Sequence, residues 1–234
     1  MKLLTNPADT SLVQQSRPPA HQSVYEDLRN RILFGDLTPG QAVTIQGLTA
    51  ELGAGMTPVR EAIRRLISEG ALRMRGNRRV CVPELTSSCV EQLDFMRKTL
   101  EPELARRAVG QMTQGVLDAL INEDTALNDA ISQGDIPGYL NHNYQFHRRL
   151  NATADAPILA ATVDRLWLRF GPSLRVVCGR YGTLNLPDKH ADLLKALRNG
   201  DSEAAALAIV EDVTQGMEQI KASLEAADET NRFD

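Results

Sequence analysis

The side chains with the clearest chemical role in this chain are seven arginines gathered between Gly55 and Val82. Glu61 and Glu69 are the only acidic residues of this stretch, so its net charge is 7 − 2 = +5. Guanidinium groups bind phosphate oxygens and the edges of guanine bases, so a basic segment of this kind is typical of a surface that contacts nucleic acid. The arginines are Arg60, Arg64, Arg65, Arg73, Arg75, Arg78 and Arg79.

A second group of residues suited to chemistry lies in the other half of the chain. Asn143 and His147 are four residues apart in a predicted helix, so both side chains project from one face of it. His190 begins a later predicted helix, and Asp212 lies on the last one. Imidazole, amide and carboxylate groups can together hold a divalent metal. A buried histidine is also a common hydrogen-bonded core residue, so a metal-free polar pocket is the alternative interpretation.

The charge distribution divides the chain into a basic first part and an acidic second part. Residues 21–85 contain nine arginines and seven acidic residues, a balance of +2, and residues 1–20 add +1. The net charge of all 234 residues is −4, so residues 86–234 carry −4 − 2 − 1 = −7. This length allows two modest domains, and only the first is suited to a polyanion.

Composition favours a helical protein in a reducing compartment. Aromatic residues are scarce, with one Trp, four Tyr and five Phe, which favours helices packed through aliphatic side chains. Cys81, Cys89 and Cys178 are odd in number and have no CxxC spacing, so we predict free thiols. The sequence has no apolar run of membrane length and no signal-peptide pattern, so we expect a soluble, cytoplasmic protein without a membrane partner.

The arginine-rich stretch has the pattern of a helix followed by a hairpin. Thr57 is expected to cap the helix, with Pro58 at the first helical position, and Gly70 marks its end. Two short strands joined at Gly76 and Asn77 follow. The strands are expected at residues 71–75 and 79–82. A helix with a basic hairpin beside it fits a winged helix-turn-helix, in which the helix enters the major groove of DNA.

The segments around this stretch define two expected domains. Helices at residues 20–34 and 45–52 complete a winged helix-turn-helix domain over residues 20–85. Residues 1–19 are polar and without periodicity, and we expect a flexible arm there. Residues 86–234 predict an all-helical bundle, so the fold class is mainly α. The helices of this bundle are expected at residues 88–109, 114–133, 136–152, 156–177, 187–199 and 202–227.

The first bundle helix has an apolar stripe that predicts its buried face. The charged pair Arg97 and Glu101 lies one turn apart, and its simplest interpretation is an ion pair on the surface, with Arg97 as an effector-binding candidate as the alternative. The residues of the stripe are Val90, Leu93, Met96, Leu100, Leu104 and Ala108.

Two sequence segments and the hairpin after them resemble the DNA-binding domain of GntR-family transcriptional regulators. The segments are LRNRILFGDLTPGQ and LTAELGAGMTPVREAIRRLISEGAL. The resemblance implies that Thr57 and Arg60 face DNA, that Arg64 lies near phosphates, and that Gln46 on the preceding helix reaches a base or a phosphate. Family wings usually carry glycine near the tip, where this chain has Arg78 and Arg79. The expected DNA-binding residues are Gln46, Thr57, Pro58, Arg60, Arg64, Arg75, Asn77, Arg78 and Arg79.

The segment MRKTLEPELARRA resembles the first helix of the FCD ligand domain of FadR-type GntR regulators. In that domain the places of Asn143, His147, His190 and Asp212 usually hold Asp or Asn, His, His and His around a divalent metal. The resemblance therefore implies a metal site here, with Zn²⁺ or Ni²⁺ foremost and Mn²⁺ also possible. Asp212 in place of histidine and the uncharged Asn143 are departures that make the ligand set harder.

The same resemblance implies a small organic acid as effector. Its carboxylate would be bound by the metal and by arginines, for which the candidates are Arg97, Arg169 and Arg175. Trp167 and Phe170, before the break at Gly171 and Pro172, are expected to form a wall of the cavity.

These features together predict a ligand-responsive transcriptional regulator of bacterial type that binds operator DNA as a homodimer, with repression as the commoner outcome in the family. Two alternatives were weighed against it. A metal-dependent hydrolase lacks a general base or nucleophile motif beside the expected ligands, so we expect no enzyme. A sequence-indifferent DNA-binding protein would have no use for an acidic helical domain with a cavity.

Overall fold

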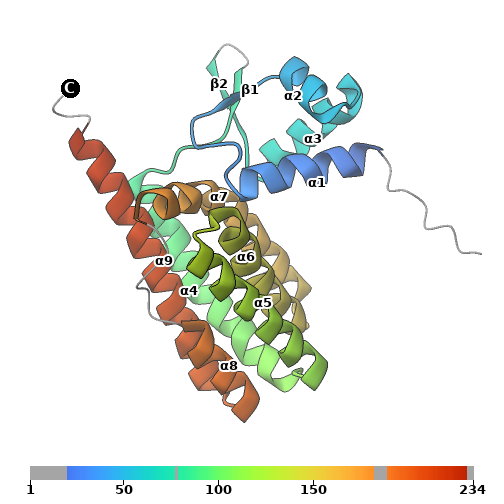
Figure 1. Ribbon diagram of the computed structural model, residues 1–234. Helices are drawn as coiled ribbons and strands as arrows, with labels where there is room; N and C mark the ends of the chain where they lie inside the picture. The colour runs from blue at the N-terminus through green and yellow to red at the C-terminus, as the bar shows by residue number, and fades with distance from the viewer. Residues whose placement is uncertain (1–19, 77–78, 182–188, 231–234) are drawn as a thin grey trace, which may run out of the picture.

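The computed structural model describes residues 20–76, 79–181 and 189–230. A small winged unit lies at one end of a helical bundle, where α1 packs against α7 (Figure 1). The mainly α fold class is thereby confirmed. The elements of the winged unit are α1 (Ala20–Leu33), β1 (Ala42–Val43), α2 (Ile45–Leu52), α3 (Met56–Ser68), β2 (Arg73–Arg75) and β3 (Arg79–Cys81). Those of the bundle are α4 (Ser87–Gly110), α5 (Gln114–Gln133), α6 (Ile136–Thr153), α7 (Pro157–Tyr181), α8 (Lys189–Asn199) and α9 (Ser202–Thr230).

The core of the winged unit lies between α1 and α3. Leu28 and Ile32 of α1 are fully buried, as are Val59 and Leu66 of α3, because both helices carry apolar residues at helical spacing. The expected hairpin is present as β2 and β3, and β1 pairs with β3 to give the sheet order β1-β3-β2. Sequence reasoning missed β1, because two residues are too short to show an alternating pattern.

The prediction that Thr57 caps α3 is wrong. The helix begins one residue earlier, at Met56, and its N-cap is Gly55, which makes no side-chain hydrogen bond. Thr57 is therefore inside the first turn and exposed, while Pro58 keeps a position where a missing N–H costs nothing. The preceding helix, α2, is the one with a side-chain cap, because the Thr44 hydroxyl accepts a hydrogen bond from the Gly47 N–H at 3.0 Å.

In the bundle, α4 and α9 pack side by side, α5 packs on α6, and α8 packs on α9 (Figure 1). The buried stripe of α4 differs from the expected one. Met96 is exposed, and the charged residues Arg97 and Glu101 take the buried positions, with relative exposures of 4% and 1%. The prediction is wrong only at Met96, because Val90, Leu93, Leu104 and Ala108 are buried and Leu100 is half-buried. The Arg97–Glu101 pair lies in the core and not on the surface.

Helix α7 makes the contact between the bundle and the winged unit. An ideal Cβ on Gly171 would lie 2.5 Å from the backbone oxygen of Leu33, so glycine lets α7 approach the end of α1 closely. Gly35, with a φ of +73°, is packed in the same way against the side chain of Arg175. Within the described ranges, no helix is long and apolar enough to cross a membrane.

We predict that Gly171→Ala lowers the melting temperature, because the new methyl group would collide with the backbone of Leu33. The overpacking cost is about 1–3 kcal/mol and should exceed the gain of about 1 kcal/mol from alanine in a helix. Gly179→Ala is the matched control in the same helix, since nothing lies within 4 Å of its added Cβ, and should leave stability unchanged or raised. Equal melting temperatures for the two variants would contradict this account of the contact.

Candidate functional site

The exposed face of α3 presents the side chains that are suited to DNA. Val59, Ile63 and Leu66 turn inward, which leaves Thr57 and Arg60 exposed on the other side of the helix. Gln46 on α2, the other helix of the helix-turn-helix, is also exposed, while Pro58 is half-buried. These positions leave the polar atoms of both helices open to a groove.

The three arginines of α3 are held differently. Arg64 bonds to Glu61 at 2.8 Å on the surface. Arg65 lies 3.6 Å over the ring of Tyr25 and bonds to Glu69 at 3.0 Å, which ties it to the packing of α1 on α3. Arg60 is exposed and has no hydrogen bond or ion pair within the part of the chain that the structure describes. Arg60 is therefore the arginine of α3 most available to a base or phosphate.

The wing places further arginines next to one another. Arg75 and Arg79 are directly opposite on β2 and β3, an arrangement of like charges that is unfavourable unless an anion lies nearby. Glu84 partly compensates, because its carboxylate accepts from Arg75 at 2.7 Å and from Arg73 at 3.4 Å. The predicted contacts Asn77 and Arg78 lie outside the described residues. The exposed pair of arginines gives the wing an anion-binding character.

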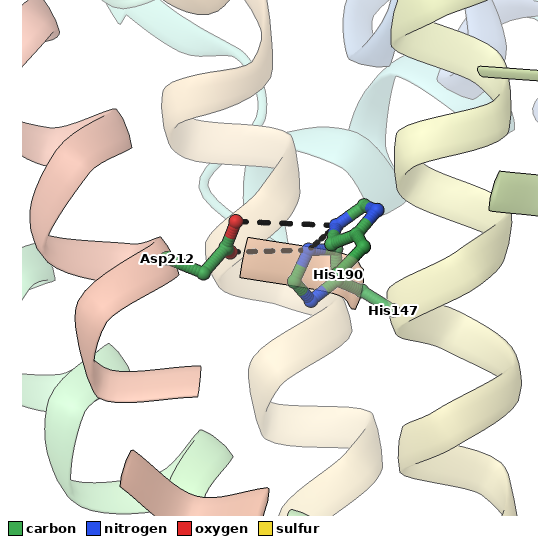
Figure 2. A group of neighbouring side chains, drawn as sticks. All are labelled: His147, His190 and Asp212. Carbon is green, nitrogen blue, oxygen red and sulfur yellow. Dashed lines mark hydrogen bonds and ion pairs between the residues drawn. The ribbon is translucent and has the colours of Figure 1, made fainter. Parts of the chain in front are cut away.

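In the bundle, three of the four predicted metal ligands meet. Figure 2 shows His147 of α6, His190 of α8 and Asp212 of α9 pointing toward one another, a group that we name the histidine cluster. The Nε2 atoms of the two histidines are 3.4 Å apart. The Asp212 carboxylate lies 3.3 Å from Nε2 of His147 and 3.9 Å from Nε2 of His190. Two ligands of one tetrahedral Zn²⁺, each about 2.1 Å from the ion, are roughly 3.4 Å apart, so this spacing fits a metal.

The outward-facing nitrogen of each histidine lies near a carboxylate. His190 Nδ1 is 3.0 Å from Asp124 of α5, and His147 Nδ1 is buried, without a hydrogen bond, 3.7 Å from Glu101. A carboxylate beside Nδ1 fixes the ring so that Nε2 remains free to bind a metal. The sequence did not predict the contact of Asp124 with His190, because only the fold brings α5 next to α8.

The charges around the histidine cluster also fit a divalent cation. Arg97, Glu101, Asp124 and Asp212 carry one positive and three negative formal charges, which is 1 − 3 = −2 when both histidines are neutral. A divalent ion balances this charge in the bundle interior, where unbalanced charge is costly. Two protonated histidines would balance it as well, but their Nε2–H groups would then face each other.

Asp212 is held as a carboxylate by its surroundings. Burial by itself raises the pKa of this group, but the charge and hydrogen bond of His147, and then His190 and Arg97, bring its pKa well below the ordinary range. The charges of the two histidines act on this carboxylate only when the rings are protonated. With neutral histidines, the charge of a bound divalent ion would keep the carboxylate ionised instead.

A cavity of about 40 Å³ lies beside the histidine cluster and is partly lined by Arg97, Asn143, His147 and Trp167. Arg97 donates to Glu101 at 2.6 Å and lies 4.2 Å over the ring of Phe170, so its guanidinium is fixed at the cavity wall. Asn143, the fourth predicted ligand, shares this wall with the cluster. The predicted wall residues Trp167 and Phe170 line the cavity as well.

The other two predicted effector-binding arginines lie elsewhere. Arg169 packs against Gly70 at the end of α3, and Arg175 packs against Gly35 after α1. Both therefore occupy the side of α7 that meets the winged unit, whereas Arg97 reaches the cavity from α4. A larger, open hollow of about 500 Å³ lies between the two units, near Pro39, Leu85 and Leu224, but it contains none of the predicted site residues.

Comparison with known proteins agrees with this architecture. Residues 20–82 match the gntR family of bacterial regulatory proteins, and residues 93–215 match the FCD domain. The HTH-type transcriptional regulator McbR of Escherichia coli (strain K12) is 30% identical over 200 residues, which cover 83% of this chain and 89% of that protein. The HTH-type transcriptional repressor RspR of the same organism is 24% identical over 210 residues, covering 87% of this chain and 91% of RspR.

Solved structures share the fold. The structure of E. coli McbR/YncC has a TM-score of 0.83 at 27% identity and covers 89% of this chain and 100% of that one. A GntR regulator from Rhodococcus sp. RHA1 has a TM-score of 0.73 at 20% identity, with coverages of 86% and 97%. With a winged unit that matches one family and a bundle that matches the other, the chain belongs to the GntR family of bacterial transcriptional regulators and carries an FCD effector-binding domain.

Proposed function

We propose that this regulator binds a pseudo-palindromic operator as a homodimer and responds to a small organic acid bound in its FCD domain with the help of a divalent metal. Regulators of this family bind operator DNA, and FCD domains bind small effectors. The observation that carries the specific proposal is the meeting of His147, His190 and Asp212 next to the buried Arg97. Two-fold symmetry of the dimer would match two half-sites, each contacted by α3 and the wing of one copy.

The ligand chemistry supports a metal-assisted carboxylate site. The two Nε2 atoms and the Asp212 carboxylate would hold the ion, with Asn143 as the candidate for a fourth ligand. A divalent metal supplies positive charge for an anionic oxygen. Arg97 would add a charge-assisted hydrogen bond to the same carboxylate, and Trp167 would cover its apolar side. Zn²⁺ and Ni²⁺ both suit imidazole ligands, and the oxygen ligands bring Mn²⁺ into range.

Repression is the proposed sign of regulation. RspR is named a transcriptional repressor, and a relative from Paenarthrobacter nicotinovorans, 23% identical over 205 residues, is named a probable repressor of a D-xylose utilization operon. In a repressor of this kind, an effector lowers operator affinity, and by reciprocity operator DNA lowers effector affinity.

We predict that Arg60→Ala weakens operator binding about 5- to 150-fold, the loss expected for one base-reading or phosphate-binding arginine, or about 1–3 kcal/mol. The variant should fold normally, because the side chain is exposed and unpaired. Arg107→Ala on α4, an exposed arginine bound to Glu103 at 2.8 Å, is the control and should bind the operator like the parent chain. Unchanged affinity of Arg60→Ala at fixed salt would exclude this residue from the DNA interface.

We predict that the double variant His147→Ala, His190→Ala loses the metal, since it removes both imidazoles of the cluster. Elemental analysis of the purified protein should give one divalent metal per parent chain and a negligible amount in the variant. His142→Ala is the control, because His142 bonds to Glu123 at 2.9 Å and contributes no ligand to the cluster. A double variant with full metal content would rule out the proposed ligands.

A further inference from the structure

A second cavity lies behind the wall of the first one. It has a volume of about 200 Å³, lies between α6 and α7, and is lined by Tyr144, Arg148, Asn151, Ala160, Asp164 and Trp167, among others. Trp167 also lines the cavity beside the histidine cluster, which measures only about 40 Å³. The indole of Trp167 is therefore a wall shared by two cavities, and the one without metal ligands is the larger.

The side chain of Asn151 lines the second cavity. Asn151 is only 6% exposed, and its side-chain amide makes no hydrogen bond within the described ranges. This amide is not among the side-chain groups that are closed off from water without a partner, so its polar atoms are accessible in the cavity. A ligand in the cavity can therefore form a hydrogen bond with it.

The rim of the cavity carries a cation that is also unpaired. Arg148 is exposed and forms no ion pair with any residue that the structure describes, whereas its neighbour Arg149 bonds to Glu123 at 3.0 Å. A guanidinium and an amide that line the same cavity, three residues apart on α6, are suited to a carboxylate, which can accept from both groups. The alanines and Trp167 make the rest of the lining largely apolar.

The far wall of the cavity is part of the contact with the winged unit. Arg29 of α1 donates to both oxygens of Asp164, at 2.8 and 2.7 Å, and to the Tyr144 hydroxyl at 2.9 Å. The Tyr144 hydroxyl donates to Asp164 at 2.6 Å, and burial, with the bond to Asp164, raises the pKa of Tyr144 to about 12, so this hydroxyl keeps its proton. We call these three residues the Arg29 network. The Arg29 guanidinium is occupied by Asp164 and Tyr144, so Arg148 is the cation that remains for an anion in the cavity.

We propose that this cavity is a second ligand site, separate from the histidine cluster, for a small monocarboxylic acid with an apolar body. The carboxylate binds Arg148 and the Asn151 amide, and the apolar body packs on Trp167 and Ala160. The ligand then touches Tyr144 and Asp164, two members of the Arg29 network, and so biases the placement of α1. The site requires no metal and goes beyond the proposed function, which places the effector at the histidine cluster.

The test uses the fluorescence of Trp167, which is the only tryptophan of the chain. The full-length protein is titrated with butyrate, hexanoate and benzoate, and with hexanamide and benzamide as uncharged controls. We expect a saturable change with at least one acid and none with its amide. Arg148→Ala should raise the dissociation constant about tenfold or more, the effect of losing a charge-assisted hydrogen bond. Arg149→Ala, the matched control, should leave it unchanged.

Two further variants separate this site from the histidine cluster. Ala161→Phe, at an exposed position that also lines the cavity, should block the acid by filling the space. The double variant His147→Ala, His190→Ala should keep the acid response, whatever its metal content.

Three results would overturn the proposal: no saturable change with any of the three acids, an unchanged dissociation constant in Arg148→Ala, or a response that disappears with the histidines instead. The last result would place the acid at the histidine cluster and support the proposed function alone. If the metal is lost and the acid response is kept, the acid binds in the second cavity, as proposed.

Discussion

The packing of α1 against α7 is the constraint on which the rest of this structure depends. In the Arg29–Asp164 ion pair the arginine side chain is only 12% exposed and the aspartate 39%, and Gly171 brings the two helices into backbone contact. A charge pair in such surroundings tolerates little displacement, because breaking it leaves a buried charge uncompensated. The winged unit is therefore held by the same helix whose Trp167 and Phe170 line the cavity beside the histidine cluster. A movement of these rings would therefore reach α1 through a single helix.

The interior of the bundle is unusually polar for a helical core, and this polarity has a physical account. Arg97, Glu101, His147, Asp212, His190 and Asp124 follow one another in a chain of close contacts through four helices and the start of a fifth. Apolar residues at these six positions would stabilise the bundle equally well, so the stability of the fold does not explain why the six residues are polar. A divalent cation, as proposed here, would explain these residues, since it would balance their charge and occupy the nitrogens that face each other.

Much of this fold follows from sequence, because capping residues, glycine stops and apolar spacing define its helices locally. The expected ranges at residues 114–133 and 45–52 agree with α5 and α2 to the residue. Sequence reasoning fails where tertiary contacts decide. Arg97 and Glu101 are buried against expectation, because hydrophobicity favoured Met96 over them. The family resemblance places Arg169 and Arg175 beside Arg97 as effector-binding candidates. Both instead pack against the winged unit, a contact that no local sequence pattern describes. Asp124 and the Arg29 network join residues more than 60 positions apart.

The proposed regulation requires the histidine cluster and the DNA-binding surface to be thermodynamically coupled through α7. The most direct test is the dissociation constant of Zn²⁺ for the full-length protein, free and bound to an operator duplex selected from a random-sequence pool. Coupling predicts that the two constants differ by a factor of about 5–150 and that saturating Zn²⁺ changes operator affinity by the same factor. Equal constants, with operator affinity independent of Zn²⁺, would contradict the claim and reduce the histidine cluster to a structural feature of the bundle.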